Sequence, residues 1–139
     1  MSETDLVIAI LEALALEPGV IAWRNAQITA RRSGRPVRGG LGTGSADIIA
    51  CVGPMGSFLA IEAKSPKGKA RPAQITWRAD LEAHGGIYVV VRSVREALEA
   101  VRLVRDGGRG VGACTRHVTP CPWCEAFLAA CASRAGAQP

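Results

Sequence analysis

The sequence predicts a small α/β protein in which helices cover a central mixed β-sheet. Apolar segments of strand length alternate with segments of helix length in the order helix, strand, strand, strand, helix, strand, helix. The chain has 139 residues, of which 48% are hydrophobic, enough for one domain with a modest core. Because only 4% of the residues are aromatic, we expect Leu, Ile, Val and Ala to build that core.

The first helix is predicted over residues 3–16. Ser2 and Asp5 have the spacing of a capping box, and apolar residues then recur on one broad face. A Pro-Gly pair ends this helix, and the next apolar run predicts a strand over residues 20–28.

Residues 29–44 are rich in arginine and glycine. Such a segment is too polar to pack into a core, so we expect a mobile loop or an irregular hairpin. Its arginines either lie along a phosphate backbone or simply keep a loop soluble: Arg31, Arg32, Arg35 and Arg38. The glycines at 39–44 precede a strand, which argues against a nucleotide-binding loop. We expect them to let backbone and substrate approach Asp47 closely.

Two apolar strands joined by a tight Gly-Pro-Met-Gly turn follow. If Val52 lies opposite Ser57, Asp47 falls directly across from Glu62 on the same face. Lys64 points the same way as Glu62, because strand side chains alternate. Paired carboxylates in an apolar setting resist ionisation, and a hard cation such as Mg²⁺ removes that penalty. The pattern predicts metal-assisted attack on a phosphate.

A basic turn leads from this hairpin into a helix predicted over residues 71–84. We expect the cations of this turn to bind DNA: Lys67, Lys69 and Arg71. A buried strand is predicted over 87–92, and a capped helix then runs to residue 106. The chain thus divides into a domain at 1–106 and a tail at 107–139.

The tail is rich in cysteine and histidine. Four residues in it have the types and spacing of a tetrahedral zinc site, and they are Cys114, His117, Cys121 and Cys124. Structural Zn²⁺ would stabilise a segment too short to bury much apolar surface. The alternatives are a redox pair in C-P-W-C or a set of unligated thiols.

The ordered motifs of the domain resemble a known family. G-S-x-D-I-I, a short hairpin, I-E-A-K-S and a helix with Gln and an aromatic residue are similar to the PD-(D/E)XK nuclease superfamily. Within it, the likeness is greatest to the virus-type replication-repair nuclease (VRR-NUC) domain of phage and bacterial proteins. The likeness covers residues 1 to 95 and includes W-R-N at 23–25 and G-G-I-Y-V-V-V-R-S at 85–93.

The resemblance implies a restriction-endonuclease-like sandwich and a DNA endonuclease that uses Mg²⁺ or Mn²⁺. It implies a 5′-phosphate product, branched or junction DNA as substrate in replication, repair or recombination, and a homodimer. Its implied metal ligands are Asp47, Glu62, the backbone carbonyl of Ala63 and an acid of the first helix, for which Glu3 matches better than Glu12. The same acid is also explained as a first-turn complement to the helix dipole.

The resemblance also implies catalytic roles for two further residues. Lys64 would position or activate the attacking water, and Gln74 would support it. The competing interpretation is a zinc-stabilised nucleic-acid-binding module without catalytic activity.

Charge and composition bear on the partner and the compartment. Seventeen Lys and Arg against twelve Asp and Glu give a net charge of +5, which favours a polyanion such as DNA. The acidic start M-S-E-T-D is unlike a secretory signal, and no apolar run is long enough to span a bilayer. We therefore expect no membrane partner and a cytoplasmic location, in a bacterial cell or a phage-infected host.

Overall fold

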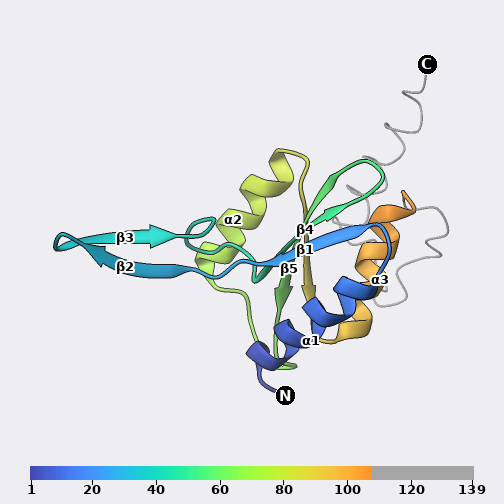
Figure 1. Ribbon diagram of the computed structural model, residues 1–139, viewed down its shortest axis with the longest axis horizontal. Coiled ribbons are helices and arrows are strands. Elements are labelled where there is room, and N and C mark those ends of the chain that lie inside the picture. The colour runs from blue at the N-terminus through green and yellow to red at the C-terminus, as the bar shows by residue number, and fades with distance from the viewer. Residues whose placement is uncertain (108–139) are drawn as a thin grey trace.

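Residues 1–107 are described by the computed structural model, and they form an α/β fold with a four-stranded mixed sheet (Figure 1). The strand order is β1-β4-β5-β6, in which β5 and β6 are parallel and the other neighbours antiparallel. The sheet strands are β1 (Val20–Arg24), β4 (Ile48–Val52), β5 (Ser57–Ala63) and β6 (Ile87–Val91). The helices are α1 (Glu3–Leu16), α2 (Pro72–Ala83) and α3 (Val94–Arg105). The predicted fold class is confirmed to this extent.

One face of the sheet packs against α1 and α3. Alternate strand residues such as Ile48 and Ile61 meet Ile10 and Leu14 of α1 and Val101 of α3, all fully or almost fully buried. The buried residues of this cluster are all Leu, Ile, Val or Ala, as the composition predicted. Burial of each large aliphatic side chain stabilises the fold by about 1.5–3 kcal/mol.

The opposite face carries α2 and a smaller cluster. Tyr88 of β6 is buried against Ala46 and Ala60, with Trp77 and Leu81 of α2 packed on top. Trp77 and Tyr88 have ring centroids 6.1 Å apart. This contact fixes α2 over the β5–β6 half of the sheet, beside the acidic ends of β4 and β5.

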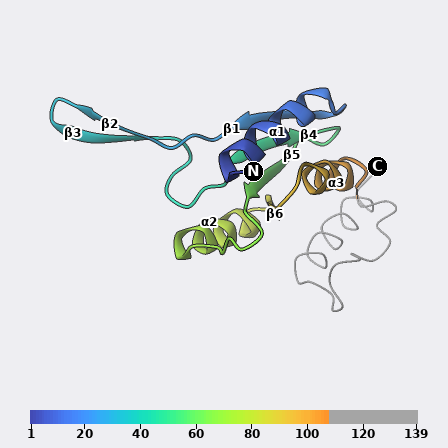
Figure 2. The same cartoon turned by 90° about the horizontal axis from the view of Figure 1, so that it is seen from below.

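Residues 28–39 form a regular hairpin of their own, which we call the arginine arm. Its strands are β2 (Ile28–Arg32) and β3 (Arg35–Gly39), and it projects from the sheet and helices in both views (Figure 1; Figure 2). Ser33 and Gly34 both have positive φ, at 51° and 76°, as a tight hairpin turn requires. The sequence predicted either a mobile loop or an irregular hairpin here. The structure has a hairpin, but a regular one.

The strand predicted over 20–28 is wrong in its extent. It ends at Arg24. The Asn25 N–H makes one more hydrogen bond to the neighbouring chain, at the Asp47 carbonyl, and Gln27 then uses its side chain to bind the segment before β4. The other predicted helices and strands lie within one or two residues of their expected bounds.

Two further expectations concern the cysteine- and histidine-rich tail and the absence of a membrane-spanning segment. The predicted zinc ligands Cys114, His117, Cys121 and Cys124 lie outside the described residues. Within residues 1–107, no helix is both long enough and apolar enough to cross a membrane.

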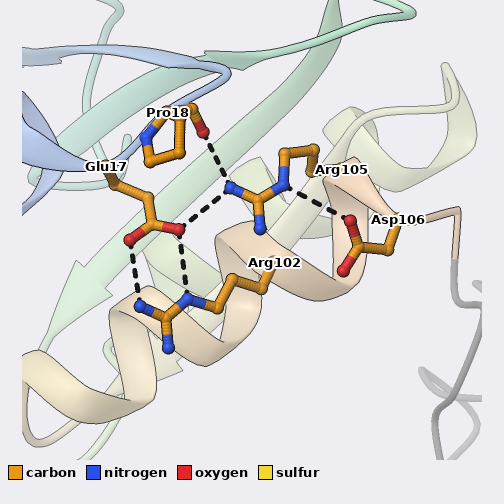
Figure 3. Close-up of polar contacts among 5 residues, drawn as sticks. All are labelled: Glu17, Pro18, Arg102, Arg105 and Asp106. Atoms are coloured by element: carbon orange, nitrogen blue, oxygen red, sulfur yellow. Dashed lines mark hydrogen bonds and ion pairs between the residues drawn. The ribbon is translucent and has the colours of Figure 1, made fainter.

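An ion-pair network joins the end of α1 to the end of α3 (Figure 3). Glu17 accepts two hydrogen bonds from Arg102, both 3.0 Å long, and one of 2.9 Å from Arg105. Arg105 also donates to the Pro18 carbonyl at 2.8 Å. These hydrogen bonds from Arg102 and Arg105 hold the pKa of Glu17 below its ordinary value of 4.5.

The network makes a pH-dependent contribution to stability. A carboxyl with a lowered pKa stabilises the fold above its unfolded value of 4.5, and this contribution is lost as the pH falls through the folded pKa. Glu17→Gln should therefore lower the melting temperature at pH 7, and the difference from wild type should shrink below about pH 4.5. Glu99→Gln, at an exposed pair 3.7 Å long, is the control and should change little. A difference for Glu17→Gln that is constant with pH contradicts the prediction.

Candidate metal and phosphate site

The register of β4 against β5 brings two carboxylates together. Val52 pairs with Ser57 and Ile48 with Ile61, as predicted, so one further step sets Asp47 opposite Glu62. Asp47 Oδ2 accepts a 3.0 Å hydrogen bond from the backbone N–H of Ala63 on β5. Asp47 therefore lies against the strand that carries Glu62.

Glu62 is almost completely buried, at 3% exposure, yet only half of its carboxylate is satisfied. Its Oε1 lies 2.7 Å from Lys64 Nζ and also accepts a hydrogen bond from Gln74 Nε2. Its Oε2 is buried and has no hydrogen-bond partner among the described residues. Burial raises the pKa of Glu62 above 4.5, and the charge of Asp47 adds to that rise while Lys64 opposes it.

Lys64 and Gln74 hold this glutamate from two elements. Lys64 follows β5 directly and is itself buried, at 8% exposure. Gln74 lies in the first turn of α2, where its Oε1 accepts the N–H of Arg71 at 2.9 Å. That bond fixes the Gln74 amide so that its nitrogen faces Glu62. The structure thus brings together the four residues that the sequence suggested for catalysis.

Of the two acids of α1 that were considered, Glu3 lies at the site. Its Oε1 accepts a 2.9 Å hydrogen bond from the N–H of Ser65, the residue after Lys64, and this bond lowers the pKa of Glu3. Glu12 is exposed and is not among the residues that line the site. Glu3 therefore anchors the start of α1 beside the end of β5.

An open pocket of about 480 Å³ lies in front of Asp47. Glu3 and Asp47 line it together with Gln74, and Arg24 and Arg71 supply its lining cations. The predicted DNA-binding Arg71 thus lies at the site. Its companions Lys67 and Lys69 are exposed and lie outside the pocket lining.

A polar clamp beside Asp47 was not foreseen from the sequence. The Asn25 amide donates to Ser45 Oγ and to the Ala46 carbonyl, both at 2.8 Å, and the Asn25 N–H donates to the Asp47 carbonyl at 2.8 Å. Gln27 also donates to Ser45 Oγ, at 3.1 Å, and Ser45 is buried. We call Asn25, Gln27 and Ser45 the arm clamp, since it joins the base of the arginine arm to the segment that holds Asp47. The W-R-N motif was the only sequence signal for it.

The oxygen atoms at the ends of β4 and β5 are suitable ligands for a hard divalent cation that takes few ligands from the protein. Residues 1–107 hold no group of three or more His, Cys, Asp and Glu side chains placed as a metal cluster. Mg²⁺, however, is usually held by one or two carboxylates, with water and substrate phosphate as its other ligands. Asp47 and the unpartnered Oε2 of Glu62 supply two carboxylates, and the Ala63 carbonyl is a third oxygen of the right type.

Gly44 permits the close packing that completes the site. Its φ is +87°, and a Cβ added there would lie 2.2 Å from the Ala73 carbonyl oxygen and 2.9 Å from the Gln74 nitrogen. The expected close backbone approach near Asp47 is therefore made by the first turn of α2. This contact sets the distance between Gln74 and the strand ends.

Replacement of Gly44 should disturb the site more than replacement of a neighbouring glycine. Gly44→Ala adds a backbone clash to the strain of positive φ, so we expect a loss of at least about 3 kcal/mol in unfolding free energy. Gly42→Ala is the matched control, because its φ is +94° but its Cβ would meet nothing within 4 Å. It should cost about 1–2 kcal/mol. Urea unfolding measures both, and equal losses would contradict the packing of α2 against Gly44.

Comparison of the sequence with protein-family models and with curated proteins found no match. The function of the site must therefore be inferred from its geometry, its chemistry and the order of its motifs.

Proposed function

We propose that this protein is a Mg²⁺- or Mn²⁺-dependent DNA endonuclease that hydrolyses phosphodiester bonds. The observation that carries the proposal is the buried Glu62, whose Oε2 has no hydrogen-bond partner within residues 1–107, while Asp47 lies opposite it in the strand register. A buried, half-satisfied carboxylate costs stability, so its position is better explained by a ligand than by the fold. The motif order that resembles the VRR-NUC domain supports the same conclusion and suggests branched DNA as substrate.

The pocket would suit a phosphodiester substrate once a divalent cation is bound. A bound divalent cation would polarise the scissile phosphate and favour attack by water. Arg24 and Arg71 line the same pocket and would hold the phosphate oxygens. Asp47 would hold the cation together with Glu62, and the hydrogen bond from Ala63 N–H keeps the Asp47 carboxylate in place.

Lys64 would act on the attacking water. Its ammonium is buried and lies 2.7 Å from Glu62 Oε1, so it is oriented before substrate binds. An ammonium in this position can hold the water or neutralise charge that develops on the phosphate. Gln74 would be a positioning residue, since it restrains the same Glu62 oxygen from α2.

Cleavage assays test the proposal directly. Asp47→Asn and Lys64→Met should each reduce Mg²⁺-dependent cleavage of duplex, flap and four-way-junction DNA by about 100-fold or more. Glu99→Gln is the carboxylate-to-amide control on an exposed surface of α3 and should cleave like wild type. Undiminished cleavage in both site variants would remove the assignment. Binding to DNA without metal-dependent cleavage in wild type would instead select the alternative, a binding module.

Metal binding can be measured without substrate. Because a ligand that binds only the folded state stabilises it, Mn²⁺ at about 100 times its dissociation constant should add about 2.7 kcal/mol of stability. We expect a rise in melting temperature for wild type and little or none for Asp47→Asn, with Glu99→Gln again as control. An equal rise in all three proteins would mean that Mn²⁺ binds elsewhere.

A further inference from the structure

The arginine arm is basic, and its arginines have no acidic partner among residues 1–107. Every residue of β2 and β3 is exposed. Residues 18–46 contain no Asp or Glu, and the four arm arginines form no ion pair with any described residue. This arm therefore holds a concentrated positive charge that the rest of the described protein leaves uncompensated.

The hairpin register distributes that charge over both faces of the arm. Arg32 pairs with Arg35, so these two side chains share one face at the tip. Arg31 pairs with Pro36 on the second rung from the tip and Arg38 pairs with Thr29 on the fourth, so their side chains share the opposite face. Like charges placed directly across a ladder are unfavourable, so the Arg32–Arg35 pair destabilises the free arm.

A ribbon with cations on both faces fits a groove better than a flat surface. On a flat phosphate surface only one face could reach phosphates, whereas groove walls lie on both sides. The major groove of B-form DNA is about 12 Å wide and admits a two-stranded ribbon.

We propose that the arginine arm lies in the major groove of B-form DNA beside the bond to be cleaved. The proposal rests on the proposed nuclease function, since it assigns the arm to the same substrate. The arm clamp connects the base of the arm to Asp47, so an arm in the groove would set where the duplex meets the pocket. Five residues per strand extend about 17 Å, which corresponds to about five base pairs.

Binding measured in EDTA tests the arm without any cleavage. Two double variants remove one face each: Arg32→Ala/Arg35→Ala and Arg31→Ala/Arg38→Ala. On a duplex of about 20 base pairs, each should lower affinity about tenfold or more and reduce the salt slope by about 1.8. The control, Arg95→Ala, removes an exposed arginine from α3, on the other side of the sheet from the arm (Figure 1; Figure 2). It should bind like wild type.

Nucleic acids of different shape distinguish binding of the arm in a groove from general electrostatic attraction of its arginines to phosphate. The major groove of an RNA duplex is too narrow for side chains to read, and a single strand has none. On these two probes the arm variants should lose clearly less affinity than on B-form DNA, because only the general attraction of the arginines to phosphate is removed. The groove assignment is overturned if only one of the two double variants loses affinity for B-form DNA. It is also overturned if affinity for RNA duplex and single strands falls as much as affinity for B-form DNA. Melting temperatures within a degree or so of the wild-type value would show that the variants remain folded, since the arm is exposed.

The two proposals can fail separately. If wild type cleaves no nucleic acid with Mg²⁺ or Mn²⁺, the nuclease assignment fails, and the EDTA binding data still decide the role of the arm. If wild type cleaves DNA while both arm variants bind like the control, the arm inference fails and the nuclease assignment stands.

Discussion

The pairing of β4 with β5 is the constraint on which the candidate site depends. Because Val52 lies opposite Ser57, the polar ends of both strands meet on one side of the sheet. A slip of one residue would turn Asp47 to the other face, into the aliphatic core formed with α1 and α3. That core therefore enforces the register, since three alternate residues of each strand are buried in it: Ile48, Ala50 and Val52 of β4, and Leu59, Ile61 and Ala63 of β5. The apolar packing that stabilises the fold also sets the geometry of the carboxylates.

The same arrangement costs stability at Glu62. A buried ion pair such as Glu62–Lys64 gains less from its attraction than it loses in hydration unless the remaining polar atoms are satisfied. Here Oε2 is not satisfied among the described residues. The fold nevertheless supports Glu62 from two other elements, since Lys64 follows β5 and Gln74 is held by Arg71 at the start of α2. Gly44 lets α2 approach closely enough for this support.

The sequence was sufficient for features set by alternation and turn length. The residue types of the core, the helix bounds and the register of Asp47 against Glu62 follow from composition and local pattern, and the buried sheet then enforces the register. The arm clamp could not be foreseen, because Asn25 and Gln27 meet Ser45 only after the arm has folded back. For the same reason β1 was predicted too long. The contact of Gly44 with Ala73 joins segments 29 residues apart, and only the packing of α2 reveals it.

Charge is divided between the pocket and the arm in a way that separates binding from chemistry. Glu3 and Asp47 balance Arg24 and Arg71 among the charged residues that line the pocket, and Glu62 is paired with Lys64. A phosphodiester anion therefore gains little net attraction from the pocket itself, and a divalent cation would supply it. The arm, with its uncompensated arginines, needs no metal to attract a polyanion. Substrate capture and hydrolysis would then depend on different residues, and the arm clamp is the physical link between them.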